Sequence, residues 1–296
     1  MLINDAHCHF FSERFFDALA TQRGHGERAS DLTHELAWDA PGDVVTLATR
    51  WVHELDTHGV GRAALIASVP GDETSVATAV KQNPDRFVGY FMLDPSASDA
   101  TARARRALTE MGMRGVCLFP AMHHVPLHDE RMLRVVEVAA SQPGTVVFVH
   151  CGVLSVGVRK KLGLPSRFNM SLGNPLALHP LAAAFPNTPF VIPHFGAGLI
   201  RETLMLADVC PNVHIDTSSS NGWTRYIPGA TLEAAFKQCI STLGPKRLLF
   251  GTDSSFFPRG WQKAIYDEQK RILDAIGTSE ADQALIFGGN FDRLFS

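Results

Sequence analysis

The chain has 296 residues, of which 45% are hydrophobic and 19% are charged, so it can bury a large core. Its 27 Lys and Arg residues and 30 Asp and Glu residues leave a net charge of −3 at pH 7. The only short basic runs cover 103–106 and 159–161, which excludes the basic surface typical of nucleic-acid-binding proteins.

Short runs of apolar, β-branched residues recur along the chain, and helical patterns follow them. The runs cover 2–5, 62–67, 87–93, 115–119, 146–150, 190–193, 213–216 and 247–251. The helical patterns cover 44–58, 73–83, 100–111, 130–140, 198–209, 232–243 and 261–275. Strands that are apolar throughout suit a parallel sheet covered by helices. Eight such runs predict an α/β fold, a (β/α)8 TIM barrel formed by a single domain over residues 1–296.

A doubly wound sheet is the main alternative fold. It usually has fewer strands and a glycine-rich turn after the first one, whereas "HCHFF" follows the first run here. Long polar segments at 21–42 and 152–175 follow the first and fifth strands, on the side where barrels build active sites. We therefore expect long loops after strands one and five.

The five cysteines lie far apart and form neither a CxxC pair nor a disulfide framework. No signal peptide is evident, and no apolar run approaches the ~18 residues of a membrane span. We therefore expect a cytoplasmic, reducing setting, with no membrane and no nucleic acid as partner.

The stretch "DAHCHFF" near the start places His7 and His9 one residue apart. Side chains alternate along a strand, so both imidazoles point the same way and Cys8 points the opposite way. In a barrel, one of these directions is the lumen. Thirteen histidines would give about half such a pair by chance, so this motif alone is weak evidence for a metal site.

Three further residues end other apolar runs. His150 ends the run in "VVFVHCG", His194 follows the run in "FVIPHFGAG", and Asp253 follows the run in "LLFGTDSSF". Taken singly, each has an ordinary explanation: a histidine after a strand is commonly a loop residue, and Asp253 could cap a helix. Their shared position at the carboxyl ends of strands favours a common site.

Imidazole and carboxylate are ligands that a divalent ion such as Zn²⁺ accepts. A catalytic metal leaves one position for a water molecule and lowers the pKa of that water to ~7. A nearby carboxylate can take the proton of the water, and a further histidine can stabilise developing negative charge. The residues therefore suit metal-assisted catalysis.

These motifs resemble the amidohydrolase superfamily. More narrowly, "PHFGAG", "NVHIDTSSS", "LLFGTDSSF" and "IFGGNFDRLF" are similar to the amidohydrolase-related family that includes aminocarboxymuconate semialdehyde decarboxylase. The resemblance implies a TIM barrel with one divalent metal ion, usually zinc. It implies His7, His9, His150 and Asp253 as metal ligands, and His194 with Asp253 as catalytic residues. Binuclear relatives carry a bridging lysine after strand four, and "RGVCLFPAMHH" has none, which favours a mononuclear site.

Other residues are weaker candidates. Asp216 at the end of the seventh run could orient His194 or the metal water, or it could be a simple turn residue. Relatives often act on carboxylated substrates, so Arg167 and Arg225 are candidates to bind a carboxylate. Trp223 could stack on a planar substrate. For Arg167, Arg225 and Trp223, a position in a solvated loop is an equally good explanation.

Two enzyme hypotheses remain open. The first is a hydrolase that uses a metal-activated water on a small, carboxylated ester, lactone or amide. The second is a non-oxidative decarboxylase, a carbon–carbon lyase, on the same scaffold, because fold and ligand set serve both. A degenerate binding protein is a third hypothesis, which the intact ligand set disfavours. Relatives often dimerise, so the resemblance also allows a homodimer, although the sequence leaves the substrate, the native metal and the oligomeric state open.

Overall fold

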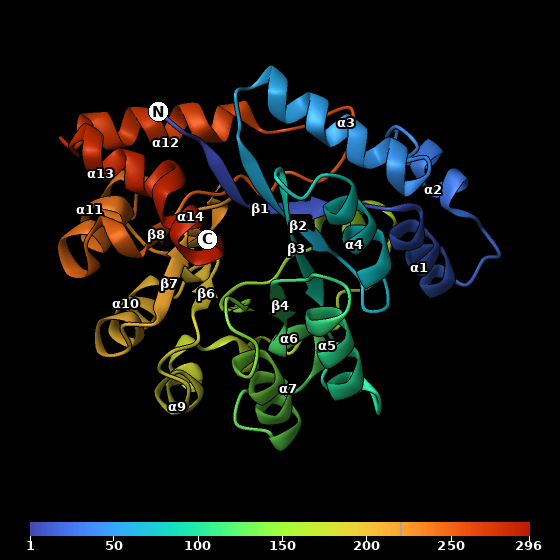
Figure 1. The fold of residues 1–296 in the computed structure, drawn as a ribbon, viewed down its shortest axis with the longest axis horizontal. Helices are drawn as coiled ribbons and strands as arrows, with labels where there is room; N and C mark the ends of the chain where they lie inside the picture. The colour runs from blue at the N-terminus through green and yellow to red at the C-terminus, as the bar shows by residue number, and fades with distance from the viewer. Residues whose placement is uncertain (220) are drawn as a thin grey trace.

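The computed structural model describes residues 1–219 and 221–296, which form a barrel of parallel strands surrounded by helices (Figure 1). The strands pair in chain order within one eight-stranded sheet. They are β1 Asn4–Phe10, β2 Arg62–Ala67, β3 Phe87–Met92, β4 Gly115–Leu118, β5 Val146–Val149, β6 Phe190–Ile192, β7 Val213–Asp216 and β8 Leu248–Leu249. The predicted (β/α)8 TIM barrel is confirmed.

Helices follow the strands and cover the outside of the barrel. They are α1 Glu13–Arg23, α2 Ala29–Glu35, α3 Val44–Thr57, α4 Glu73–Gln82, α5 Ala100–Thr109, α6 Pro120–His123, α7 Glu130–Ala140, α8 Gly157–Lys161, α9 His179–Ala184, α10 Ile200–Val209, α11 Leu232–Leu243, α12 Lys263–Ala275, α13 Glu280–Ala284 and α14 Asn290–Phe295. The seven predicted helices are present, with ends that differ by at most two residues. In the described part of the chain, no helix has both the length and the apolar character needed to cross a membrane.

Apolar side chains form two layers, one on each side of the strands. In β2, Ala64 and Ile66 pack inside the barrel, while Leu65 packs outward against the helices. Phe291 and Phe295 of α14 belong to the inner layer at the amino ends of the strands, where Arg62, the first residue of β2, lies over the Phe291 ring. The cavity lined by His7, His150 and His194 lies at the opposite, carboxyl ends of the strands, where barrels build active sites.

Strand β1 extends beyond its predicted end at residue 5. It continues to Phe10, so His7 and His9 lie within the strand rather than after it. The barrel closes here: the His9 N–H donates to the Ser254 carbonyl at 2.7 Å, and the Asp253 N–H donates to the His7 carbonyl at 2.9 Å. These polar residues pair as strand because of partners far along the chain, which a local pattern cannot reveal.

The two long connections after β1 and β5 contain helices that their polar composition did not indicate. The first holds α2 and the second holds α8. Apolar residues of these connections pack together, with Phe15 and Leu32 in the same cluster as Val158 and Leu162. The two connections therefore form one cap beside the carboxyl ends of the strands.

Candidate metal centre

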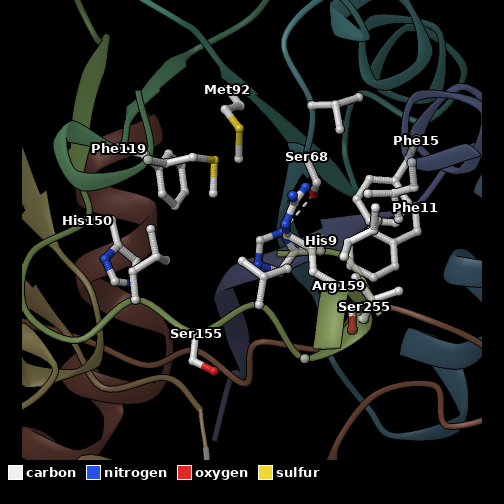
Figure 2. A pocket seen from close by; sticks show the side chains of 18 of the residues that line it. His9, Phe11, Phe15, Ser68, Met92, Phe119, His150, Ser155, Arg159 and Ser255 are labelled. Carbon is white, nitrogen blue, oxygen red and sulfur yellow. Dashed lines mark hydrogen bonds between the residues drawn. The ribbon is translucent and has the colours of Figure 1, made fainter. Parts of the chain in front are cut away.

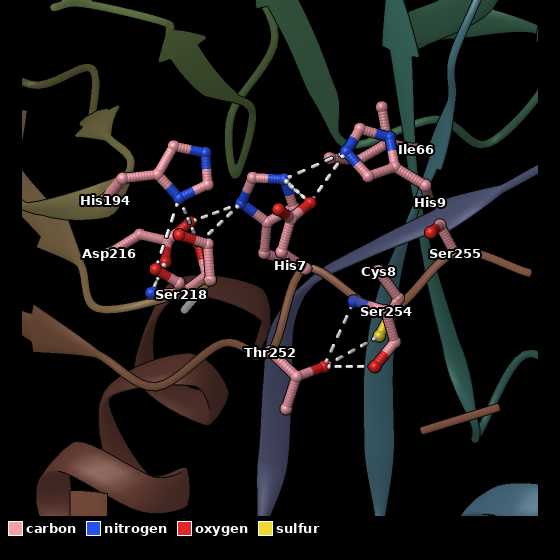
Figure 3. A network of polar contacts seen from close by, with 12 residues as sticks. His7, Cys8, His9, Ile66, His194, Asp216, Ser218, Thr252, Ser254 and Ser255 are labelled. Carbon is pink, nitrogen blue, oxygen red and sulfur yellow. Dashed lines mark hydrogen bonds and ion pairs between the residues drawn. The ribbon is translucent and has the colours of Figure 1, made fainter. Parts of the chain in front are cut away.

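His7 and His9 bring two imidazole nitrogens together at the mouth of the barrel. Their Nε2 atoms are 3.3 Å apart, and Cys8 between them packs outward in the barrel–helix layer. The predicted alternation of these three side chains is therefore present. Figure 3 shows the His7 ring between those of His9 and His194, and the His7 ring centroid is 5.1 Å from each of them.

Asp253 completes a group of three converging atoms. Its Oδ1 lies 3.1 Å from Nε2 of His9 and 3.6 Å from Nε2 of His7. The residue adopts a left-handed backbone conformation, with φ of 60°, which Asp tolerates better than most residues. This conformation and the hydrogen bond of its N–H to β1 aim the carboxylate at the two histidines.

The outer nitrogens of both histidines have partners that set their protonation. The His7 Nδ1 is 2.7 Å from Oδ2 of Asp216, a buried carboxylate that can only accept a hydrogen bond. The Ser68 hydroxyl donates to the Ile66 carbonyl at 2.9 Å, so it accepts from Nδ1–H of His9 at 2.7 Å. In the neutral rings, both protons therefore reside on Nδ1, and both Nε2 atoms present lone pairs.

The arrangement fits a divalent cation. Two lone pairs and a carboxylate oxygen, all within 4.8 Å of one another, repel unless a positive charge lies between them. Around a tetrahedral Zn²⁺ with metal–nitrogen distances of ~2.0–2.1 Å, neighbouring ligand atoms are roughly 3.3 Å apart. The three observed separations of 3.1, 3.3 and 3.6 Å match this spacing.

Charge and burial set the protonation of the group. Burial opposes ionisation of Asp253, but contact with His9 and the charges of His7 and His194 hold its pKa below its usual range. Burial lowers the pKa of His9 and of His194. Burial opposes protonation of His7 as well, but the charge and hydrogen bond of Asp216 and the charge of Asp253 raise its pKa. Metal binding requires neutral imidazoles beside an ionised carboxylate, so His7 would give up any proton on Nε2 when an ion binds.

His194 lies beside this group and has a different hydrogen-bond partner. Its backbone is left-handed, with φ of 57°, and its Nδ1 is 3.2 Å from the Ser218 carbonyl and 2.9 Å from the Ser218 hydroxyl. Because a carbonyl only accepts, Nδ1 carries the proton and Nε2 is free to accept one. The same hydroxyl lies 3.0 Å from Nδ1 of His7, so Ser218 links the two rings.

The structure brings the remaining candidates, His150 and Asp216, to the same site, and their roles at the metal stay predictions. His150 lines the same cavity and stacks on Phe119. The ring centroids of His150 and His194 are 5.4 Å apart. His150 is not one of the three residues whose ligand atoms converge. Burial holds its pKa well below the usual range. Asp216 contacts His7, whereas the Ser218 carbonyl and hydroxyl contact His194. The contact with His194 that the sequence suggested as one option is therefore made by Ser218.

A cavity of about 890 Å³ opens above these residues, and Figure 2 shows part of its lining. Of the three predicted substrate-binding residues, only Arg167 lines it. Trp223 is buried and donates to Asn221 at 2.8 Å, and Arg225 contacts the exposed Tyr226. A stacking role for Trp223 and a carboxylate-binding role for Arg225 therefore receive no support from this geometry.

Sequence reasoning missed several contributors to the site. Ser68 and Ser218 orient the histidines, and Arg259 lines the cavity six residues after Asp253. Ser68 is the first residue after β2 and Ser218 is the second residue after β7, positions at which a hydroxyl could have been suspected. No local signal distinguishes Arg259 from a surface arginine.

The fold and the convergent residues define a TIM barrel with a candidate metal centre at the carboxyl ends of its strands. The chain belongs to the amidohydrolase family, since the family model with that description matches residues 5–296. This confirms the resemblance found in the sequence.

Two characterised relatives share part of the chain. A hydratase of 2-keto-4-carboxy-3-hexenedioate from Sphingobium sp. is 25% identical over 243 residues, which cover 74% of this chain and 69% of the hydratase. The fluG protein of Emericella nidulans is 26% identical over 170 residues, 56% of this chain. The match spans only 18% of the fluG protein.

Solved structures with the same fold cover nearly the whole chain. The 5-carboxyvanillate decarboxylase of Sphingomonas paucimobilis has a TM-score of 0.66 at 18% identity, covering 99% of this chain and 98% of its own. An amidohydrolase of Burkholderia multivorans with bound zinc has a TM-score of 0.67 at 16% identity, covering 100% and 99%. A mutant 5-carboxyvanillate decarboxylase of Novosphingobium aromaticivorans with bound manganese has a TM-score of 0.66 at 16% identity, covering 99% and 97%.

Proposed function

We propose that this chain is a metal-dependent hydrolase that cleaves an ester, lactone or amide bond in a small, carboxylated substrate. One observation carries the proposal: Nε2 of His7, Nε2 of His9 and Oδ1 of Asp253 lie within 4.8 Å of one another inside a large cavity. His194 stands beside them, and its Nε2 has no hydrogen-bond partner among the described residues. A structural barrel would have no need to gather unpaired lone pairs at a buried point.

One divalent ion, Zn²⁺ in the first instance, is the proposed cofactor. His7, His9 and Asp253 would hold it, with His150 as the proposed fourth ligand. When bound, such an ion lowers the pKa of a water molecule and polarises a carbonyl group. Homologous folds with bound zinc and bound manganese support a divalent ion of this kind.

The side chains of this protein supply the proton transfers. Asp253 is the proposed acceptor of the proton from the attacking water: its depressed pKa keeps it ionised at neutral pH, and a bound ion would lower the pKa of the water. His194 holds its Nδ1–H on the Ser218 carbonyl, so its Nε2 faces the reaction as a proton carrier. After accepting a proton, that nitrogen can stabilise an oxyanion or protonate the leaving group.

The metal assignment is tested by comparing His7→Ala, His150→Ala and the matched control His128→Ala, an exposed histidine outside the cavity. We expect about one equivalent of zinc in the parent and the control. We expect the His7 and His150 variants to lose more than the roughly 100-fold in affinity that loss of an outer hydrogen-bond partner costs. Wild-type affinity in the His7 variant would refute the site.

The reaction is tested with a panel of lactones, esters and amides of small carboxylic acids in H₂¹⁸O. Hydrolysis predicts a product heavier by one water that contains ¹⁸O. His194→Asn should lower kcat while zinc remains bound, because His194 is outside the ligand group. Release of carbon dioxide without addition of water would reject the hydrolase in favour of a lyase.

A decarboxylase is the second candidate, because the cavity walls are rich in flat side chains. Phe11, Phe15, Trp38, Phe119 and Phe256 all line it, and such walls suit an aromatic acid. Two of the similar structures are 5-carboxyvanillate decarboxylases. Bicarbonate or carbon dioxide formed in equal amount to a decarboxylated aromatic product would establish this reaction.

A further inference from the structure

A second cavity, of about 360 Å³, opens at the amino ends of the strands, at the end of the barrel opposite the metal centre. We call it the amino-end cavity. Its lining includes Arg62 and Phe87, the first residues of β2 and β3, and Arg114 and Thr145, which directly precede β4 and β5. Its volume lies within the range of ~300–1,000 Å³ that is usual for small-molecule sites. The function proposed above makes no use of this cavity.

A column of aromatic rings separates the amino-end cavity from the metal centre. Phe295 lines the amino-end cavity, and its ring centroid is 5.9 Å from that of the buried Tyr90. The Tyr90 centroid is 6.3 Å from that of Phe148, which in turn is 5.1 Å from the His7 centroid. In the described part of the chain, no residue lines both cavities. A ligand in one cavity is therefore not in contact with the other.

Arg114 is held in place but has no acidic partner. Its Nε donates to the Gly144 carbonyl at 2.8 Å. Gly144 has a φ of 73°, and a Cβ at this position would collide with Nη2 of Arg114, so the glycine leaves room for the guanidinium. Among the described residues, no carboxylate oxygen lies within 4.0 Å of Arg114, and its Nη1 and Nη2 have no hydrogen-bond acceptor. Two donors of a fixed guanidinium are thus available to a ligand.

The remaining groups leave one uncompensated positive charge in the amino-end cavity. Arg62 pairs through Nη1 with Asp292 at 3.2 Å, and its guanidinium lies 5.2 Å from the centroid of the Phe291 ring. No acidic residue is among the described residues that line the cavity. Since Asp292 balances Arg62, the charge of Arg114 remains without a counterpart.

The chemistry of the lining indicates the class of ligand. A guanidinium binds a carboxylate through two parallel hydrogen bonds, and this pair becomes stronger as water is removed from it. One uncompensated charge matches a carboxylate better than a phosphate monoester, which carries about −1.5 to −2. Val80, Leu108 and Phe295 provide apolar walls beside the two arginines, and such walls suit an apolar ligand body.

We propose that the amino-end cavity is a second ligand site, which binds a small monocarboxylate with an apolar body and holds its carboxylate on Arg114. The site goes beyond the proposed function, because it requires neither a metal ion nor a reaction. Failure of the hydrolase proposal would leave it unchanged.

Methionine methyl groups report on the two cavities separately in NMR spectra of the zinc-loaded protein. Met113 lines the amino-end cavity, whereas Met92 and Met122 line the cavity above the metal centre. Titrations with benzoate and with neutral benzamide present the same flat body with and without the charge. We expect a saturable shift of the Met113 signal, with benzoate bound about tenfold more tightly than benzamide, as for a charge-assisted hydrogen-bonded pair. Shifts confined to Met92 and Met122, no shift at all, or equal affinities at Met113 would overturn the site.

The variant Arg114→Gln locates the effect, and Arg105→Gln is the matched control, since Arg105 is an exposed arginine of α5 that lines neither cavity. At Met113, Arg114→Gln should bind benzoate as weakly as benzamide, while the other methionine signals keep their wild-type positions, which shows that the variant is folded. The control should keep the tenfold preference. A wild-type preference in Arg114→Gln would refute the assignment of the carboxylate to this residue, and the comparison of the two probes on the wild type decides the proposal even if the variant does not fold.

Discussion

Replacing Asp216 by Asn tests whether this carboxylate determines which nitrogen of His7 carries the proton. The carboxylate accepts two hydrogen bonds, from Nδ1–H of His7 at 2.7 Å and from the Ser218 N–H at 2.6 Å. An amide of the same shape has one oxygen and one NH₂ group, so it can accept only one of them. If the oxygen serves His7, the NH₂ group opposes the Ser218 N–H. If the oxygen serves Ser218, His7 must move its proton to Nε2, which can no longer bind a metal.

Either outcome has a magnitude that follows from this geometry. An opposed, buried pair of donors costs about 1–3 kcal/mol of folding free energy. A wrong protonation state of His7 costs about 10- to 100-fold in metal affinity, the usual effect of losing an outer carboxylate partner. We expect the second effect to dominate, because the Ser218 N–H is part of a buried turn that cannot easily move.

The assay is competition for zinc between the protein and a chromogenic chelator, with urea denaturation of the metal-free protein as the second readout. Asp292→Asn is the control, because Asp292 also bonds β1, through Asn4 at 3.0 Å, but lies outside the cavity. The control should keep wild-type zinc affinity. If Asp216→Asn keeps both wild-type zinc affinity and wild-type stability, the reasoning about the His7 proton is refuted.

Three further predictions concern the site and the core. Gly251→Ala would place a Cβ 2.9 Å from the Cβ of His7, so zinc affinity should fall more than about tenfold; a titration that matches the wild type would contradict this. Ser68→Ala removes the acceptor of Nδ1–H of His9 and should weaken zinc binding about 10- to 100-fold, whereas Ser68→Thr should retain most of it. Burial lowers the pKa of His214 to about 3, below an unfolded value of about 6.5. The unfolded state therefore takes up the proton first, and stability should fall between pH 6.5 and pH 3, by about 3 kcal/mol at pH 4. Urea denaturation should show a smaller acid loss in His214→Leu, and an equal loss would exclude His214 as the cause.

The barrel could be predicted because its signals are local. The bounds of β2 and β7 match the predicted 62–67 and 213–216, since each is an apolar run that needs no distant partner to be recognised. Strand β1 differs, because His7 and His9 are polar and become strand only through pairing with β2 and with the segment that holds Asp253. The helices α2 and α8 escaped detection for a related reason. They are short, and their stability depends on the packing of the connection after β1 against the connection after β5.

The candidate site was only partly visible in the sequence. The spacing of His7 and His9, and the position of Asp253 after an apolar run, marked three residues whose ligand atoms the structure brings within 4.8 Å. His150 lies in the same cavity but outside that group. Its position at a strand end predicts that it reaches the cavity, but not how close its ring comes to the other ligand atoms. Arg259 had no signal in the sequence, because its contacts with Asp253, Ser255 and Phe256 form only when their shared loop folds beside the metal centre.

The amino-acid sequence by itself determined the order of strands and helices and the residues that stand at the carboxyl end of each strand, because hydrophobic periodicity is a property of neighbouring residues. Only the tertiary structure decided which nitrogen of each imidazole faces the centre and which cations remain unpaired. His7 and its partner Asp216 are 209 positions apart. Their hydrogen bond exists only because the barrel closes, and closure depends on the register of all the strands together.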